Sequence, residues 1–180
     1  MELLKEIRDS EFREDTKIRT REAVRAVIFN DKGMIPLLFV SKHSYHKLPG
    51  GGIEAGEDKM TALARETREE VGCDIEANGE VGKIIEYRAY TDDGLKQTSF
   101  CFWGKVASRI HKTKFTEDEL SEGFQLVWVS LEGAISVFGG DKPTNHEGGL
   151  IQKRDLTFLK RAKQMMKTNH LMRSIASPRL

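Results

Sequence analysis

The stretch from Gly50 to Cys73 constrains this 180-residue chain more than any other part of it. It opens with three consecutive glycines and continues into a segment whose apolar residues recur at helical spacing. The side chains expected on the buried stripe are those of Met60, Leu63, Ala64, Thr67 and Val71. Gly72 is placed to end the helix. The pattern therefore predicts a glycine-rich loop that leads directly into one amphipathic helix.

Three glutamates of this segment, Glu66, Glu69 and Glu70, share one face of the expected helix. Like charges at that spacing repel, and the last turn of a helix disfavours anions. A divalent cation would reverse both penalties, because carboxylate oxygens suit Mg²⁺ or Mn²⁺. For the glutamates alone, a solvated acidic face with Arg65 paired to Glu69 is the simpler explanation. The adjacent glycine loop lets the backbone approach a phosphate or a metal closely, and so favours a metal-phosphate site.

The spacing of glycine, glutamate and arginine in this segment resembles the Nudix box, the signature of the Nudix hydrolases. Gly51 is followed after five residues by Glu57, and after seven more by the run Arg65–Cys73 (RETREEVGC). Thr67 and Cys73 depart from the pattern, because the family usually has aliphatic residues there. Both side chains are small enough to pack, so the departures concern packing more than catalysis.

The rest of the chain is expected to surround this segment with strands and further helices. Residues 1–20 are expected to form a short helix or an arm packed on the body, and 169–180 a tail that can lack order. The other expected elements are strands at 23–29, 35–40, 84–90, 98–106 and 124–129, and helices at 131–138 and 155–166. Turns are expected at 30–33, 78–79 and 91–94, and a loop at 139–149. This order predicts an α/β fold with a mixed sheet covered by helices, in one domain spanning 1–168. It agrees with the α/β/α sandwich that the Nudix resemblance implies.

The resemblance also implies a reaction, the hydrolysis of a nucleoside diphosphate linked to another group by attack of water at phosphorus. Glu69 and Glu70 are then the principal ligands of Mg²⁺ or Mn²⁺. Glu66 is a further ligand, or the group that activates the water. Arg65 would orient Glu66 by ion pairing, and its alternative role is a surface pair with Glu69.

Three further positions are assigned by the same resemblance. Glu57 would tie the loop to the helix or reach the metal through water. The carbonyl of Gly50 would join the metal shell. Glu122, from the acidic segment 116–122, is the candidate general base, although a solvated loop explains that segment equally well.

Substrate contacts are expected from residues in and around the glycine loop, namely Arg25, Lys42, Tyr45, Lys47, Gly51 and Gly52, with Arg21 and His43 as further candidates. Each cation taken alone can equally be a surface charge. Tyr45 and His43 would stack on a base or stand exposed in a loop. We expect a nucleoside triphosphate, including an oxidised one, to be cleaved to monophosphate and pyrophosphate.

The alternatives are an ADP-ribose or dinucleoside polyphosphate hydrolase, and Tyr90 resembles a tyrosine of the latter group. A catalytically silent nucleotide-binding sensor is an alternative of another class, and an RNA-directed hydrolase that uses the basic segment 151–180 is a third. The overall net charge of +1 says nothing about nucleic acid. A solvated outer face explains the basic segment more simply, so a nucleic-acid partner is not expected.

The composition places the chain among ordinary globular proteins. Its two cysteines form no zinc or disulfide pattern. The sequence has no apolar run that would serve as a signal peptide or a membrane span, so a cytoplasmic location without membrane partners is expected by default. Nudix proteins often dimerise, so a homodimer is compatible with the resemblance, but no segment of the sequence indicates an interface.

Overall fold

Strand β2 (Ile18–Phe29) separates the two halves of the hydrophobic core in this computed structural model, which describes residues 1–15, 17–90, 93–107 and 112–177. From Ala23 to Phe29 every residue of β2 is buried. Successive strand residues point to opposite faces. Val24, Ala26 and Ile28 accordingly pack with α1 (Lys59–Glu70), whereas Val27 and Phe29 pack in the cluster that contains α4 (His146–Thr168).

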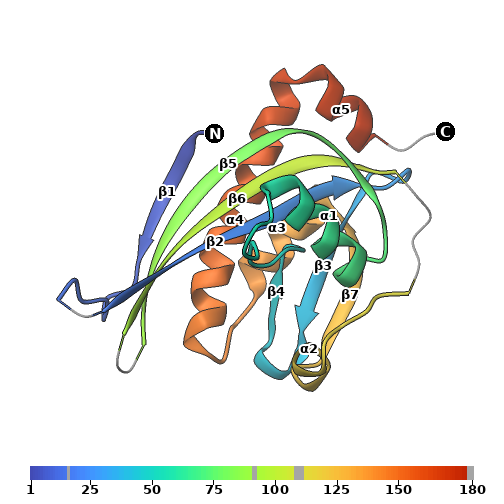
Figure 1. The fold of residues 1–180 in the computed structure, drawn as a ribbon. Helices are drawn as coiled ribbons and strands as arrows, with labels where there is room; N and C mark the ends of the chain where they lie inside the picture. The colour runs from blue at the N-terminus through green and yellow to red at the C-terminus, as the bar shows by residue number, and fades with distance from the viewer. Residues whose placement is uncertain (16, 91–92, 108–111, 178–180) are drawn as a thin grey trace.

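The other elements follow one another along the chain as drawn in Figure 1. The remaining strands are β1 (Leu3–Arg8), β3 (Met34–Val40), β4 (Tyr45–Lys47), β5 (Ile75–Ala89), β6 (Gly94–Val106) and β7 (Phe124–Ser130). The remaining helices are the short 3₁₀ turn η1 (Ser41–His43), α2 (Glu117–Ser121), α3 (Leu131–Gly140) and α5 (His170–Ala176).

The strands form two sheets. The larger sheet has the order β1-β5-β6-β2 and is mixed, because β5 and β6 are antiparallel while β1 and β2 run parallel to their neighbours. The smaller sheet has the order β4-β3-β7 and is antiparallel. The predicted mixed sheet and α/β class are therefore confirmed.

The predicted turn at residues 30–33 is present, but it does not close a hairpin. Asn30 Oδ1 accepts hydrogen bonds from the amides of Lys32 and Met34, and Gly33 has a φ of +69°. The strands on either side of the turn belong to different sheets, so the turn carries the chain from one sheet to the other. Pro36 pairs with Trp128 of β7, at a point of β3 that the short strand β4 does not reach.

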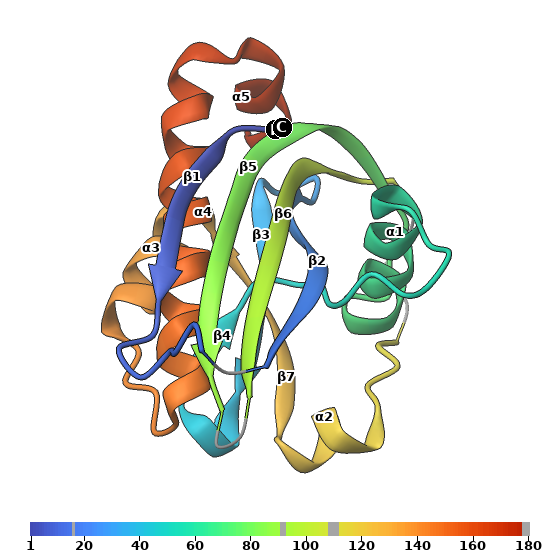
Figure 2. The ribbon, with the colours of Figure 1, turned by 60° about the vertical axis from the view of Figure 1, so that its left-hand side comes forward.

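Helices cover both sides of the strands. Figure 2 shows α1 on one side, and α3 and α4 on the other. α1 packs on β2, whereas α4 contacts β1, β4 and β5. In the part of the chain that the structure describes, no helix combines the length and the apolar character needed to cross a bilayer.

The two ends of the chain can be compared with what the sequence led us to expect. Of the two alternatives for residues 1–20, the short helix is wrong, because Leu3–Arg8 is a strand, and its parallel pairing with β5 agrees with an arm packed on the body. Residues 170–176 form α5, whose Met172 is fully buried against the core, so this part of the expected tail is ordered. Residue 16 and residues 178–180 lie outside the described part of the chain.

Two internal boundaries also need correction. The expected turn at Asn78 and Gly79 lies inside β5, where the register shifts between Ala77 and Gly79 and the indole of Trp103 lies against the glycine. α4 begins at His146, because Asn145 caps it by accepting from the amide of Gly148, so the expected loop at 139–149 is shorter. The turn expected at 91–94 includes Thr91 and Asp92, which lie outside the described residues.

Candidate active site

Helix α1 ends before Gly72 as the sequence predicts, but its buried face is rotated. Asp58 caps it by accepting a hydrogen bond from the amide of Thr61 at 2.7 Å, and Gly72 follows its end with a φ of +76°. The buried residues of the helix are Ala62, Leu63, Glu66, Thr67 and Glu70. Met60 is 43% exposed, so its place on the predicted stripe is wrong. The helix thus turns two glutamates inward, toward the glycine loop.

Arg65 connects three of the acidic side chains. Its Nη1 donates to Glu66 Oε1 at 2.8 Å and to Glu69 Oε2 at 3.4 Å. Its Nε and Nη2 donate to the carboxylate of Glu57, and Nη2 also donates to the carbonyl of Gly52 at 2.9 Å. Both roles considered for Arg65 are therefore present in the geometry, and the bond to Glu66 is the shorter one.

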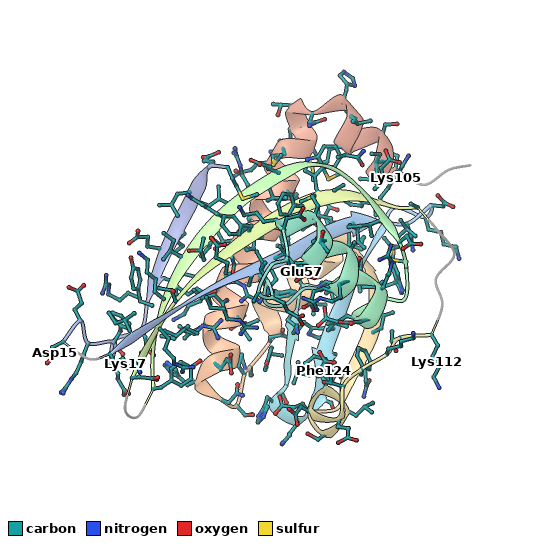
Figure 3. All side chains as sticks on the ribbon, viewed as in Figure 1. Asp15, Lys17, Glu57, Lys105, Lys112 and Phe124 are labelled. Atoms are coloured by element: carbon teal, nitrogen blue, oxygen red, sulfur yellow. The ribbon has the colours of Figure 1, made fainter. Side chains whose placement is uncertain are left out.

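Glu57 lies in the loop that precedes α1, near the middle of the view in Figure 3. Its carboxylate accepts from Arg65 and from the amide of Glu54, which joins the loop to the helix. The hydrogen bond from Arg65 lowers the pKa of Glu57 below its usual value. Of the two roles expected for Glu57, these contacts agree with the one in which it ties the loop to the helix.

Glu70 is the most deeply buried of the four glutamates. Its side chain is 2% exposed, and its carboxylate accepts from Lys47 Nζ at 2.9 Å and from the amide of Gly50 at 2.6 Å. Lys47, expected among the substrate contacts, is therefore bound to a glutamate of α1. Glu70 thereby joins the last turn of α1 to Lys47 and Gly50, which precede the helix.

The glycine loop lies antiparallel to β2. The amides of Val24 and Ala26 donate to the carbonyls of Gly51 and Pro49. A Cβ on Gly50, whose φ is +130°, would lie 2.1 Å from the carbonyl oxygen of Val24, and one on Gly51 would lie 2.3 Å from Glu66 Oε1. Bare backbone is needed at both positions, because β2 and Glu66 occupy the space that a side chain would fill.

Glu66 lies in an environment that opposes its negative charge. Burial raises the pKa of its carboxyl, the nearby charge of Glu70 raises it further, and the hydrogen bond from Arg65 only partly counteracts them. Glu57, Glu66, Glu69 and Glu70 together carry four negative charges, against two positive charges on Arg65 and Lys47, which leaves two in excess.

This donor set fits a hard divalent cation in chemistry and in charge. Glu66 Oε1 also lies where a side chain on Gly51 would otherwise stand, so the carboxylate meets bare backbone at the loop. Within the described residues, no three acidic, histidine or cysteine groups converge closely enough to hold an ion, and Arg65 lies between the carboxylates.

The remaining expected site residues are either grouped beside α2 or buried. Lys42 Nζ and His43 Nε2 are 3.8 and 3.7 Å from Glu122 Oε1, so these three residues form a group of their own beside α2. Arg25 and Tyr45 are buried, at 6% and 5% exposure. Neither is therefore presented to a ligand from solvent in this structure.

The contacts of the two buried residues explain their positions. Arg25 Nη1 donates to the carbonyls of Val24 and Gly51. Burial raises the pKa of Tyr45 to about 12, and its ring lies against Gly148 at the start of α4. Arg21 also reaches the loop, because its guanidinium lies beside Gly52.

One residue beside the site was missed from the sequence. Asp155 of α4 accepts a hydrogen bond from the amide of Leu48 at 2.8 Å, one residue from Lys47. The signal was a charged pair, Arg154–Asp155, inside the helical stripe of buried residues that includes Ile151, Phe158 and Leu159. Charged residues within an apolar stripe indicate a specific buried contact.

The geometry of loop and helix can be compared with known families. The model of the NUDIX domain matches residues 19–159. This span contains the glycine loop, α1 and every strand of the two sheets except β1. The chain belongs to the NUDIX domain family. The family prediction made from the residues of the box is confirmed.

Solved NUDIX structures confirm the fold. The MutT protein from Methanosarcina mazei Go1 aligns over 85% of this chain and 99% of its own, with a TM-score of 0.56 and 21% identity. A NUDIX hydrolase from Nitrosomonas europaea aligns over 82% of this chain and 90% of its own, with a TM-score of 0.56 and 19% identity. The predicted Nudix-type architecture is therefore correct.

One curated relative shows higher identity over a shorter span. An RNA pyrophosphohydrolase of Ruthia magnifica subsp. Calyptogena magnifica is 37% identical over 70 residues, which are 39% of this chain and 39% of the relative. The alignment thus spans about two fifths of the relative's length.

Proposed function

We propose that this NUDIX chain is a metal-dependent pyrophosphohydrolase that cleaves a nucleoside diphosphate linked to another moiety. The observation that carries the proposal is the position of Glu70, buried at the end of α1 and bound to both Lys47 and the amide of Gly50. Lys47 and the amide of Gly50 pair this buried carboxylate, but two further glutamates beside it on the same helix still repel its charge, a cost that a divalent cation would relieve. A site for phosphate and a divalent cation requires such a group.

The metal would be Mg²⁺ or Mn²⁺, held by Glu66, Glu69 and Glu70 with the carbonyl of Gly50, and with Glu57 reached through water. When bound, such an ion neutralises phosphate charge and makes a water molecule more acidic. Glu66 is assigned as a ligand or as the group that orients the attacking water. Arg65 orients Glu66 and Glu57 through the bonds described above.

The backbone of the loop and the cations beside it would bind the phosphates. Glu66 lies against Gly51 and the guanidinium of Arg21 lies beside Gly52, so an acid and a cation flank the backbone of the loop. Lys42 and Glu122 are retained as a phosphate contact and a candidate base. Their mutual contact places them at one location beside α2.

For the substrate, we infer a free nucleoside triphosphate, including oxidised forms. Water would attack phosphorus, one phosphoanhydride bond would break, and the products would be the monophosphate and pyrophosphate. ADP-ribose and dinucleoside polyphosphates contain the same linkage and are the alternatives within this reaction class.

A second candidate substrate is the 5′ end of RNA. It is favoured by the name of the Ruthia magnifica relative, an RNA pyrophosphohydrolase. The exposed lysines of α4, Lys153, Lys160, Lys163 and Lys167, are cations that an RNA backbone could contact. This candidate differs from the first in the body of the substrate and not in the bond that is broken.

A product assay with a substrate panel separates these candidates. Purified protein with Mg²⁺ or Mn²⁺ would be offered nucleoside triphosphates, oxidised guanine nucleotides, ADP-ribose, diadenosine polyphosphates, and 5′-triphosphate and capped RNA. We expect pyrophosphate from a free triphosphate. Cleavage of RNA alone would select the second candidate. Tight nucleotide binding without cleavage of any compound would contradict the enzyme proposal and support a silent sensor.

A further inference from the structure

A buried ionic network lies between α4 and the larger sheet. Arg154 and Asp155 of α4 and Glu86 of β5 are each at most 1% exposed. Arg154 Nε donates to Asp155 Oδ1 at 2.6 Å, and Arg154 Nη1 donates to Glu86 Oε2 at 3.3 Å. Buried ion pairs stabilise little relative to apolar residues of the same volume. Packing alone therefore does not account for these charges.

The network reaches the glycine loop at one atom. Asp155 Oδ2 accepts from the amide of Leu48 at 2.8 Å, and this bond is buried. Leu48 stands between the two donors to Glu70, the side chain of Lys47 and the amide of Gly50. The bond from Leu48 to Asp155 thus holds the backbone segment that presents both donors.

The backbone of the loop is also bound by β2. β2 binds its carbonyls, because the amides of Ala26 and Val24 donate to Pro49 and Gly51. An amide at the start of the loop is bound by the carboxylate of α4. The loop is thereby held by two elements, through backbone groups of β2 and one side chain of α4.

We propose that Asp155 is a positioning residue for the Nudix site, fixing the loop of residues 47–51 so that Lys47 and Gly50 meet Glu70. The proposal rests on the proposed function in that Glu70 must serve the reaction. Asp155 acts through Leu48, and Arg154 holds its carboxylate in place by donating to both oxygens. A shift of about 1 Å in groups that position a reaction can cost about 10²-fold in rate.

The first test is kinetic. In Asp155→Asn one carboxylate oxygen becomes an amide donor, so the side chain can no longer accept from Arg154 and Leu48 as before. We expect kcat to fall by about 10²-fold while KM changes little, because the substrate groups themselves remain.

Ser99→Ala is the matched control, because it removes a bond to Glu86 of the same network, from Ser99 Oγ at 3.3 Å, and leaves the bond to Leu48 in place. It should lower the free energy of unfolding and leave kcat unchanged. An unchanged kcat in Asp155→Asn, or an equal loss in both variants, would overturn the proposal.

The second test reads the loop directly by amide hydrogen exchange. In the wild-type protein the amides of Leu48 and Gly50 should exchange only on global unfolding. In Asp155→Asn they should exchange through local opening, while the amide of Ala26 stays protected. Rapid exchange of both loop amides in the wild type would refute the proposal even if the variant does not fold. Absence of hydrolase activity in the wild type would instead contradict the proposed function. The exchange data would still decide whether Asp155 fixes the loop.

Discussion

Arg65 holds Glu57 through two parallel hydrogen bonds, from Nε to Oε1 at 2.9 Å and from Nη2 to Oε2 at 3.0 Å. The remaining nitrogen of the guanidinium reaches Glu66 on the same helix. One planar group therefore sets the position of the loop carboxylate and of a candidate metal ligand together.

Replacing Arg65 by lysine should impair catalysis far more than folding. A lysine has a single ammonium and cannot reproduce the fork that grips Glu57 while also holding Glu66. We expect kcat/KM to fall by at least about 10-fold, and the free energy of unfolding to change by no more than about 1 kcal/mol, because Arg65 is partly exposed.

Arg68→Lys provides the control for this change. Arg68 is on the same helix, is 63% exposed and pairs with Asp74. Steady-state kinetics and urea unfolding of both variants would measure the two effects. Equal kcat/KM values for Arg65→Lys and wild type would contradict the positioning role of Arg65.

A methyl group on Gly51 should disturb Glu66. The added Cβ would lie 2.3 Å from Glu66 Oε1, so the carboxylate must move away from the loop. Gly51→Ala should therefore lose about 10²-fold in turnover. Gly139→Ala, where the added atom meets nothing within 4 Å, should retain wild-type turnover. Equal turnover in the two variants would contradict the prediction that close contact between Glu66 and the loop is needed for catalysis.

Two neighbouring glycines at the start of α4 should respond in opposite ways to alanine. In Gly149→Ala the new methyl meets no atom within 4 Å, and the loss of backbone freedom in the unfolded chain should stabilise the protein by about 0.5–1 kcal/mol. In Gly148→Ala the methyl would lie 2.6 Å from the ring of Tyr45, which should destabilise it by about 1–3 kcal/mol. Thermal unfolding of both variants measures the difference, and shifts of the same sign would disagree with this packing.

Acid should weaken the fold through Glu86. Burial raises the pKa of its carboxyl, but the charges of Arg154 and Arg88 outweigh burial and hold the pKa below its usual value. Such a group stabilises the fold above its unfolded pKa of about 4.3, and the contribution is lost as pH falls through the folded pKa. The free energy of unfolding should therefore decline below about pH 5.

Glu86→Gln should remove part of that decline and should cost about 3 kcal/mol at pH 7, because it leaves the buried arginines undercompensated. The exposed Glu117→Gln in α2 serves as the control, and its pH dependence should match that of the wild type. Denaturant unfolding between pH 3 and pH 7 would show the effect. Identical pH dependence in wild type and Glu86→Gln would rule out this contribution.

The local part of the site was predictable from sequence. Arg65, Glu66, Glu69 and Glu70 are brought together by helical spacing alone, and the glycines in front of the helix mark a close backbone approach. The face of the helix was predicted less well. Met60 fits the apolar period, yet the helix is rotated so that Glu66 and Glu70 face the loop.

The long-range part of the site was not predictable, because it depends on topology. The bonds from Lys47 to Glu70 and from Leu48 to Asp155 join residues that are 23 and 107 positions apart. The N-terminal strand β1 was missed because its apolar residues Leu3, Leu4 and Ile7 do not alternate with the charged ones as in a typical half-buried strand. β5 continues through Asn78 and Gly79 because the glycine leaves room for Trp103, so the turn signal was overridden.

The most direct test of the central claim compares phosphoanhydride cleavage by the wild type and Glu70→Gln, with Mg²⁺ or Mn²⁺ present and with each omitted. The substitution keeps the shape of the side chain but removes the charge that Lys47 and the amide of Gly50 share. We predict metal-dependent turnover in the wild type and almost none in Glu70→Gln, with cooperative unfolding retained. Full turnover in a folded Glu70→Gln variant would contradict the assignment of the site.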